Sequence, residues 1–258
     1  MWDELHDALE RAASNDDVKV VILRGAGPCF CGGYDLEDIG DALYGWSGGD
    51  LKDRPSLRKI IRTDQKMYWS SYLPILYFPK VIIAQLHGFC VGGGLFVANM
   101  CDLKIASEDC KIGHVDQRIG FGGTASPDIV ALILSVGLTR ARGLLLRGNT
   151  VSGKEAEHIG LVNMAVPMEK LEETVMKVAR EMCLLPADGI TLGKAMTLLV
   201  YEQLGVTSGL MHGVLGHSLY MNVRYEPGEQ SYLKESAEKG AKGYFRERDR
   251  RYREIWEK

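Results

Sequence analysis

The hydrophobic pattern divides the chain into short apolar runs and longer amphipathic stretches. Val18–Leu23 and Val81–Leu86 are nearly continuous runs of β-branched and aliphatic residues, which are typical of strands buried on both faces. Shorter runs predict two more strands, at Leu103–Ala106 and Lys111–Gly113. Apolar residues spaced three and four apart predict helices elsewhere. The predicted helices are residues 1–13, a stretch from Arg58 to about Leu76, and residues 94–100, 127–136, 139–146, 152–158, 168–184, 187–203 and 231–257.

Strands that alternate with helices in this way predict an α/β fold with parallel strands. The segment 37–56 lies between them and is rich in Gly and Asp, so we expect a surface loop there. Ser126 followed by Pro127 is a typical helix start, and we expect Ser126 to be the N-cap of the helix 127–136.

Glycine is in excess and gathers where predicted strands end. It makes up 30 of the 258 residues, about 12% against an average of roughly 7%. Gly32-Gly33 follow the first strand and Gly92-Gly93-Gly94 the second. Glycine lets a backbone N–H approach a ligand without a Cβ in the way, and two such groups can hold one oxyanion. Phosphate binding and tight packing are the alternatives, although neither G-x-G-x-x-G nor a complete Walker A motif, G-x-x-x-x-G-K-[ST], occurs here.

Composition and charge narrow the class of protein. The apolar fraction is 46% and the net charge is −3, so neither nucleic acid nor an anionic membrane is an expected partner. No apolar run approaches the roughly 18–20 residues that span a bilayer. The acidic, amphipathic first residues do not resemble a signal peptide. The six cysteines have no paired C-x-x-C spacing, so we expect free thiols, no metal site and a cytoplasmic location.

Three stretches of the chain resemble the crotonase (enoyl-CoA hydratase/isomerase) superfamily. Phe30-Cys31-Gly32-Gly33-Tyr34-Asp35-Leu36 resembles the family's F-[SC]-x-G-x-D-L loop. His87–Gly94, followed by Cys101-Asp102 and Ala106-Ser107-Glu108, resembles its triple-glycine signature. The stretch from Arg147 to Pro167 resembles the segment that closes the family's core. These matches occur in the expected order between about residues 2 and 170.

The resemblance implies a spiral of ββα turns followed by a helical region that trimerises. We therefore expect a crotonase-like core over residues 1–186 and a C-terminal helical region over 187–258. The ligand implied is an acyl-CoA thioester. No cofactor is expected besides the coenzyme A that the substrate carries, and the implied assembly is a homotrimer or a dimer of trimers.

Carried over motif by motif, the resemblance implies an oxyanion hole formed by the backbone N–H groups of Gly32 and Gly93. The thioester oxygen would lie between them. Other residues of the matching motifs are expected around the substrate, and Asp35 is also expected to cap the helix that follows it. The expected substrate-contacting or CoA-contacting residues are Cys31, Gly33, Asp35, Gly92, Phe96 and Gly120.

The catalytic carboxylates of the family are only partly present. Hydratases of the family use two glutamates, and Phe96 stands at the position of the first. Asp116 stands at the position of the second, in Gly113-His114-Val115-Asp116. One carboxylate beside an oxyanion hole can remove a proton and return it elsewhere. We therefore favour enoyl-CoA isomerisation, with hydration, C–C cleavage or thioester hydrolysis as alternatives.

The neighbouring polar residues allow more than one interpretation. His114 either orients Asp116 and shares its proton, or fills space as a polar residue. The Tyr34 hydroxyl either donates to the substrate, or its ring forms a wall of the acyl pocket. Asp128 is explained by the dipole of the helix that it begins, although some family members place a catalytic acid nearby.

Two features support a rival interpretation, a degenerate protein that binds CoA thioesters or acts in assembly. The first is Phe96. The second is the start of the chain, which lies directly on the first helix where family members have a strand pair and a loop that contributes to the CoA site. At the other end, we expect Lys239–Lys258 to form an exposed amphipathic helix that packs on a partner subunit.

Overall fold

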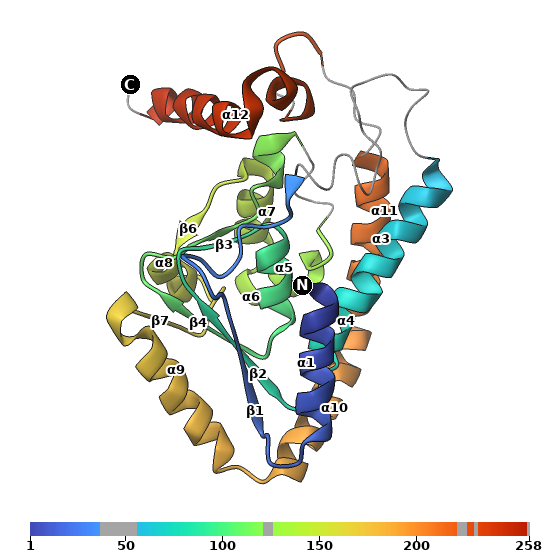
Figure 1. Ribbon diagram of the computed structural model, residues 1–258, viewed down its shortest axis with the longest axis vertical. Helices are drawn as coiled ribbons and strands as arrows, with labels where there is room; N and C mark the ends of the chain where they lie inside the picture. Colours follow the sequence, from blue (N-terminus) through green and yellow to red (C-terminus); the bar gives the residue numbers. More distant parts are fainter. Residues whose placement is uncertain (37–55, 121–125, 221–225, 230–231, 257–258) are drawn as a thin grey trace.

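The computed structural model describes residues 1–36, 56–120, 126–220, 226–229 and 232–256, and its strands form two small sheets (Figure 1). The larger sheet is parallel, with the order β1-β2-β4-β7. In the smaller sheet, β3 pairs parallel with β5 and β5 pairs antiparallel with β6. The strands are β1 (Val20–Arg24), β2 (Val81–Leu86), β3 (Phe89–Val91), β4 (Leu103–Ser107), β5 (Lys111–Gly113), β6 (Val151–Ser152) and β7 (Met164–Val166). The predicted α/β class with parallel strands is confirmed.

The helices follow the amphipathic stretches of the sequence. They are α1 (Trp2–Ser14), α3 (Leu57–Ser71), α4 (Leu73–Leu76), α5 (Gly93–Met100), α6 (Ile129–Val136), α7 (Leu138–Arg147), α8 (Gly153–His158), α9 (Met168–Cys183), α10 (Ala187–Gln203), α11 (Val206–Tyr220) and α12 (Tyr232–Trp256), with a 3₁₀ turn η2 (Asp116–Ile119). Gly240 interrupts α12 with a non-helical conformation. Each predicted helix is present to within a few residues, although the helix expected to reach Leu76 is divided into α3 and α4 at Tyr72.

The pattern did not predict α11, nor the short strands β3, β6 and β7. Three glycines weaken the helical signal of α11, because glycine is a poor helix former. Two of them serve close packing on α6 instead. A Cβ on Gly209 would lie 2.8 Å from a methyl carbon of Val130, and one on Gly213 would lie 2.6 Å from the Cα of Pro127. The same helix also lies beside α3 (Figure 1).

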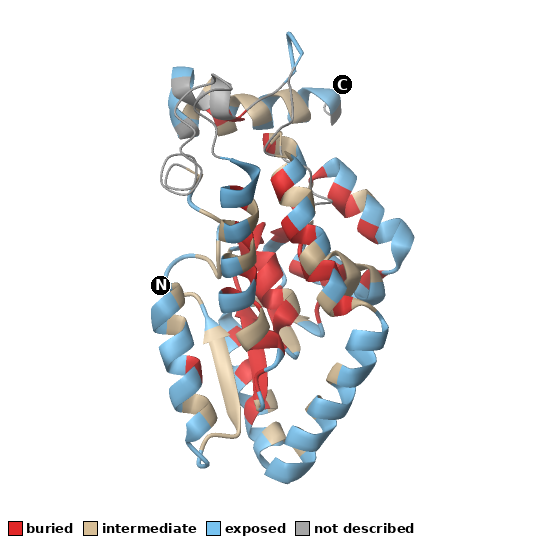
Figure 2. Ribbon diagram, turned by 90° about the vertical axis from the view of Figure 1, so that its right-hand side faces the viewer, coloured by how far each residue is buried: buried red, intermediate tan, exposed pale blue. Residues whose placement is uncertain are grey.

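The buried strand β2 separates two layers of core. Val81 and Ile83 point to one face, where they pack against Leu171, Val175 and Ala179 of α9. The alternate residues Ile82, Ala84 and Leu86 point to the larger core on the other face. Since both faces are covered, every residue of the strand is buried, which explains its continuous apolar run. Figure 2 shows the buried residues gathered through the centre of the molecule, with the outer helices mostly exposed.

Backbone pairing brings the two predicted glycine loops together. Cys31, after β1, forms a parallel bridge with Cys90 in β3. The Cys31 N–H donates to the Phe89 carbonyl at 2.9 Å, and the Val91 N–H donates to the Cys31 carbonyl at 3.2 Å. Gly88 adopts a positive φ of 61° just before this pairing. The chain segments that carry Gly32 and Gly93 are therefore fixed relative to each other.

Within the described residues, no single helix is long and apolar enough to cross a membrane. The successive helices α9 and α10 reach that length and hydropathy only when taken together, and they are bent by 101° at their junction.

Replacement of Gly88 by alanine should disturb the pairing of the two loops. A Cβ there would lie 2.2 Å from the Pro28 carbonyl oxygen, and φ is in the left-handed region. We expect Gly88→Ala to lower the free energy of unfolding by about 1–3 kcal/mol, measured by urea denaturation. Gly27→Ala is the matched control, because a Cβ at Gly27 meets nothing within 4 Å. Equal stability of the two variants would contradict this account of the loop.

Candidate active site

The two glycine loops meet at one wall of a cavity of about 320 Å³. Gly32, Gly33, Gly92 and Gly93 all line it. A Cβ on Gly33 would lie 3.8 Å from the Gly93 nitrogen and 3.9 Å from the Gly92 Cα, so the loops are in contact. Gly92 has φ 51° and ψ −123°, a conformation essentially restricted to glycine. The sequence prediction that these loops form one site is consistent with this contact.

Two backbone donors in this cavity have no acceptor among the residues that the structure describes. Within the described part of the chain, no oxygen accepts a hydrogen bond from the N–H of Gly32 or of Gly93. The Gly92 N–H, by contrast, donates to the Gly113 carbonyl at 3.2 Å. Gly93 is also the first residue of α5, where the helix dipole favours negative charge. The pair of free N–H groups is the arrangement that binds an oxyanion.

Asp116 places a carboxylate in the same cavity. It is the first residue of η2, and its Oδ1 would be 3.7 Å from a Cβ on Gly92. Its Oδ2 is buried and has no hydrogen-bond partner. Burial raises the pKa of this carboxyl group above its ordinary value, although the nearby His114 opposes the rise. A carboxylate with a raised pKa is better suited to exchange protons near neutral pH.

Near Asp116, a buried histidine and a buried carboxylate lie side by side, a pairing that sequence reasoning did not identify. His114 Nε2 is 3.3 Å from Asp128 Oδ2, and both side chains are fully buried. Burial alone would lower the pKa of His114, but the carboxylate of Asp128 raises it above its ordinary value. Burial disfavours ionisation of Asp128, yet His114, Ser126 and Asn99 hold its pKa below the usual range.

The prediction that Ser126 caps the following helix is wrong. The helix α6 begins at Ile129 with Asp128 in the N-cap position, and the Ser126 hydroxyl donates to the Asp128 carboxylate instead. The Asp128 side chain makes no capping hydrogen bond. It turns inward, where Asn99 Nδ2 donates to it at 2.6 Å. The dipole explanation for Asp128 is therefore insufficient, because the side chain serves a buried network.

Tyr34 forms part of the cavity wall. Its ring lies over Gly93, because a Cβ there would be 3.0 Å from Tyr34 Cε2. Its hydroxyl makes a hydrogen bond with the hydroxyl of Tyr72. Burial raises the pKa of Tyr34 further above neutrality. This placement favours the wall interpretation of Tyr34, since its hydroxyl already has a partner, and donation to a substrate stays a prediction.

The other predicted residues lie around the cavity without lining it. The Phe96 ring stacks on the His114 ring at a centroid distance of 5.3 Å and meets Tyr72 edge-on. Cys31 packs against Gly94, and Gly120 ends η2 in a left-handed conformation. Asp35 was expected to cap the helix that follows it, but the residues after Leu36 lie outside the described part of the chain. Residues 37–55 of the predicted surface loop also lie outside them.

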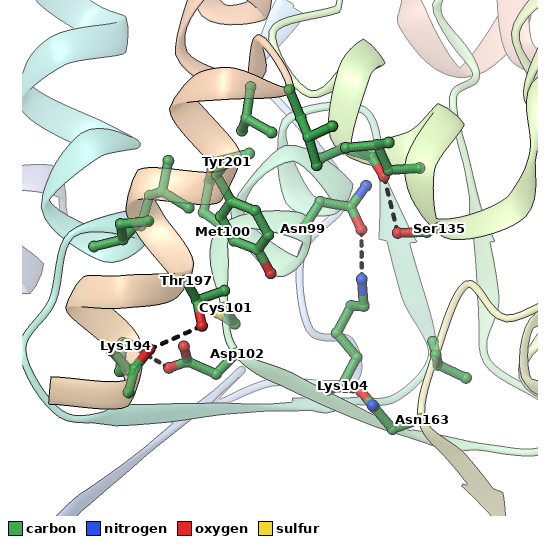
Figure 3. A pocket seen from close by; sticks show the side chains of 18 of the residues that line it. Asn99, Met100, Cys101, Asp102, Lys104, Ser135, Asn163, Lys194, Thr197 and Tyr201 are labelled. Atoms are coloured by element: carbon green, nitrogen blue, oxygen red, sulfur yellow. Dashed lines mark hydrogen bonds and ion pairs between the residues drawn. The ribbon is translucent and has the colours of Figure 1, made fainter. Parts of the chain in front are cut away.

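A second, larger cavity of about 590 Å³ lies between α5, α6 and α10 (Figure 3). Lys194 pairs with Asp102 at 2.5 Å on one side of it. On the other side, Lys104 Nζ donates to Asn99 Oδ1 at 2.9 Å. None of the predicted site residues lines this cavity, so its size alone does not make it the active site. Asn99 connects it to the buried Asp128.

Helix α11 brings a further ionisable pair near the site. His217 Nδ1 is 2.9 Å from Asp64 Oδ2, which is fully buried on α3. The charge of His217 lowers the pKa of Asp116. Sequence reasoning missed this pair because it did not predict α11. Among the described residues, no group of three or more His, Cys, Asp or Glu side chains could hold a metal ion.

Comparison with known proteins now identifies the family. The family model for enoyl-CoA hydratase/isomerase matches residues 1–203. The chain belongs to the enoyl-CoA hydratase/isomerase family. The resemblance to the crotonase superfamily is thereby confirmed.

Two curated relatives illustrate the range of the enoyl-CoA hydratase/isomerase family. The human mitochondrial enoyl-CoA hydratase domain-containing protein 3 is 27% identical over 228 residues, which cover 88% of this chain and 68% of that protein. The peroxisomal Δ(3,5)-Δ(2,4)-dienoyl-CoA isomerase of Arabidopsis thaliana is 36% identical over 165 residues, or 62% of this chain and 56% of that one. Hydratase-named and isomerase-named proteins are thus both similar to this chain.

Solved structures of the family share the fold. An enoyl-CoA hydratase from Mycobacterium smegmatis aligns with a TM-score of 0.82 at 24% identity, covering 97% of this chain and 84% of that one. An enoyl-CoA hydratase/isomerase from Xanthobacter autotrophicus Py2 aligns with a TM-score of 0.77 at 25% identity, covering 97% and 88%. The predicted crotonase fold is therefore confirmed.

The His114–Asp128 pair should make stability depend on pH. Because folding raises the pKa of His114, its protonated form adds stability below pH 6.5, the ordinary pKa of histidine. This added stability is lost as the pH rises through the pKa of the folded state. Because folding lowers the pKa of Asp128, its ionised form adds stability above pH 3.8, the ordinary pKa of aspartate. This added stability is lost as the pH falls through the pKa of the folded state. Relative to Asp128→Asn, we expect the wild type to be more stable by about 3–5 kcal/mol near pH 5.5, and by less at pH 8.5.

Urea denaturation at the two pH values measures this difference. Asp109→Asn is the control, because Asp109 is exposed. A difference between wild type and Asp128→Asn that is the same at both pH values would show that the buried pair is not charged.

Proposed function

We propose that this protein isomerises the double bond of an enoyl-CoA, with Asp116 carrying the proton. The observation that supports this proposal is that one cavity holds two backbone donors and one buried carboxylate oxygen, Asp116 Oδ2, that have no partner among the described residues. The Asp116 carboxylate removes a C2 proton from a 3-enoyl thioester. The electron pair moves to the thioester oxygen, which Gly32 and Gly93 hold. The same proton is then delivered to C4, and the 2-enoyl thioester is released.

The chemistry of the cavity supports both the removal of the proton from C2 and its delivery to C4. A backbone donor aimed at a developing oxyanion is worth about 3 kcal/mol, so two donors lower the barrier to the dienolate substantially. The raised pKa of Asp116 brings the carboxyl closer to the pH at which it both accepts and returns a proton. We propose that no cofactor is needed beyond the CoA of the substrate.

Hydration is less well supported, because it calls for a second carboxylate at the reacting carbons. Phe96 packs against His114 in place of such a group. Asp128 is buried among its partners and does not line the cavity. Within the described residues, Asp249 is the other carboxylate that lines it, and Asp249 accepts hydrogen bonds from Arg248. One free carboxylate favours proton transfer over addition of water.

Replacement of Asp116 by asparagine should stop the reaction without preventing binding. Asparagine keeps the shape but cannot accept the C2 proton, so we expect kcat for a 3-enoyl-CoA to fall about 10²–10⁴-fold, with KM little changed. Appearance of the 2-enoyl product and exchange of the C2 proton in D₂O, both followed by NMR, are the measurements. Asp109→Asn, an exposed acid on another loop, is the matched control.

Other outcomes separate the alternatives. Turnover that survives Asp116→Asn would contradict the mechanism. Formation of a 3-hydroxyacyl-CoA from a 2-enoyl-CoA would favour hydration. Binding of thioesters without any turnover would favour the degenerate binding protein.

We also propose that α10 and α11 form a subunit contact in a homotrimer. Helix α10 buries none of its side chains. Large apolar residues are exposed along both helices, namely Leu192, Met196, Leu199, Leu215 and Leu219. Apolar surface of this extent marks a protein interface. The C-terminal helix packs on its own chain, because Tyr244 of α12 is fully buried in a cluster with Ile119 and donates to the Arg118 carbonyl.

Light scattering after size exclusion should therefore give about three times the chain mass of 28.6 kDa. Leu199→Glu introduces a charge into the proposed contact and should shift the protein toward the monomer. Leu146→Glu, on the exposed side of α7, should not. A monomeric wild type at micromolar concentration would refute the contact.

A further inference from the structure

The cavity that holds Asp116 also carries an excess of basic side chains. Lys111, Arg118 and Arg248 line it, and the acids that line it are Asp116 and Asp249. Asp249 Oδ1 is already engaged, because Arg248 donates to it from Nε at 2.9 Å and from Nη2 at 2.7 Å. Arg118 therefore has no carboxylate of its own among the described residues of the cavity.

Arg118 is held in place while part of its guanidinium stays unused. Its Nε donates to the Arg147 carbonyl at 2.9 Å, and its guanidinium carbon lies 4.0 Å from the centre of the Tyr252 ring. Gly148 leaves room for its stem, since a Cβ there would be 2.9 Å from Arg118 Cγ. Within the described part of the chain, neither terminal nitrogen of Arg118 has an acceptor. A fixed fork of free donors is the usual receptor for a carboxylate or phosphate.

The surrounding charges make an anion favourable at this point. Burial lowers the pKa of Arg118, and the neighbouring cations Arg248 and Arg147 lower it further, although Tyr252 and, to a smaller extent, Asp249 oppose them. Arg248 is itself largely covered, with 15% of its side chain exposed. Like charges held together in a partly dry cavity repel each other, and a bound anion would relieve that repulsion.

An acyl-CoA offers two anions, and geometry distinguishes them. Arg118 follows Asp116 by two residues on η2, so their Cα atoms are about 5 Å apart. The pantetheine arm places thirteen bonds between the thioester sulfur and the nearest phosphorus, roughly 16 Å when extended. Because Arg118 lines the same cavity as Gly32, Gly93 and Asp116, the far end of a short acyl group whose thioester sits at Gly32 and Gly93 can reach its guanidinium. The phosphates of an extended pantetheine arm would lie farther from the thioester.

We propose that Arg118, assisted by Arg248, binds a carboxylate at the far end of the acyl group. The substrate class is then the CoA half-thioester of a short unsaturated dicarboxylic acid. This inference rests on the proposed isomerase function, because the thioester must occupy the glycine donors for the far end of the acyl group to reach Arg118.

The test compares the mono-CoA thioester of hex-3-enedioic acid with its ω-methyl ester, which lacks the charge. We expect the wild type to show at least tenfold higher kcat/KM for the acid. Arg118→Gln and Arg248→Gln should each lower kcat/KM for the acid much more than for the ester. Arg253→Gln is the control from the same helix as Arg248, since Arg253 is exposed and does not line the cavity.

The N-acetylcysteamine thioesters of the same two acyl groups, which carry no phosphate, separate the two anions. A preference for the acid that persists with these thioesters supports the carboxylate site. Arg118→Gln could instead lower kcat/KM equally for the acid and the ester, and only for the CoA thioesters. That result would assign the basic residues to the CoA phosphates. It would overturn the inference and leave the proposed isomerase function intact. Absence of turnover of every thioester by the wild type would refute the proposed function, and the carboxylate site with it. The acid-to-ester ratio of the wild type decides the question even if a variant fails to fold.

Discussion

The parallel pairing of Cys31 with Cys90 is the contact on which the site depends. It joins a loop after β1 to a strand that follows β2, two segments about sixty residues apart in sequence. The hydrogen bonds of this pairing use up the donors of Cys31 and Val91. The Gly32 N–H follows that of Cys31 directly, and the Gly93 N–H lies one residue beyond that of Gly92, which donates to the Gly113 carbonyl. Among the described residues, neither Gly32 nor Gly93 has an acceptor for its N–H. An oxyanion site is therefore a by-product of how the pairing ends. The lack of a side chain matters at Gly93, where a Cβ would lie 3.0 Å from the Tyr34 ring, whereas a Cβ on Gly32 would meet nothing within 4 Å.

A buried polar chain supports the other side of the cavity. Asp128 contacts His114 and Asn99, and Asn99 in turn accepts a hydrogen bond from Lys104 at the second cavity. Buried charges are costly unless they are paired, so these groups fix one another's positions. Phe96 contributes by stacking on His114. Phe96, which departs from the family's hydratase pattern, thus has a structural role. It holds the imidazole of His114, which interacts with both Asp128 and Asp116.

Sequence reasoning succeeded where local pattern and motif determine the outcome, and failed where packing decides. The strand β2 and the glycine loops carry strong local signals, so their places were predictable. Helix α11 was missed because its glycines, which allow close contact with α6, also weaken its helical pattern. Asp128 was misinterpreted for a related reason. A carboxylate at a helix start suits the dipole in any protein, and only the fold reveals that the side chain turns toward His114 rather than toward the backbone. Arg118 carried no signal at all, because a single arginine beside a motif is indistinguishable from a surface charge until its neighbours are known.

Several polar groups without a protein partner gather in the cavity of Asp116, although other buried atoms without a partner, such as His87 Nδ1 and Ser107 Oγ, belong to residues that do not line it. A buried donor or acceptor without a partner costs about 1–3 kcal/mol. The cavity holds one such carboxylate oxygen and the N–H of the buried Gly93, together with the N–H of the exposed Gly32 and the free end of the partly buried Arg118 guanidinium. In this cavity, the loop pairing and the buried His114–Asp128 pair keep these groups from turning to satisfy one another. A ligand that supplies an oxygen to the N–H groups, an acidic C–H to the carboxylate and an anion to the guanidinium satisfies all of them at once. Their spacing therefore constrains the length of that ligand as well as its chemistry, because each partner must be reached from the same bound thioester.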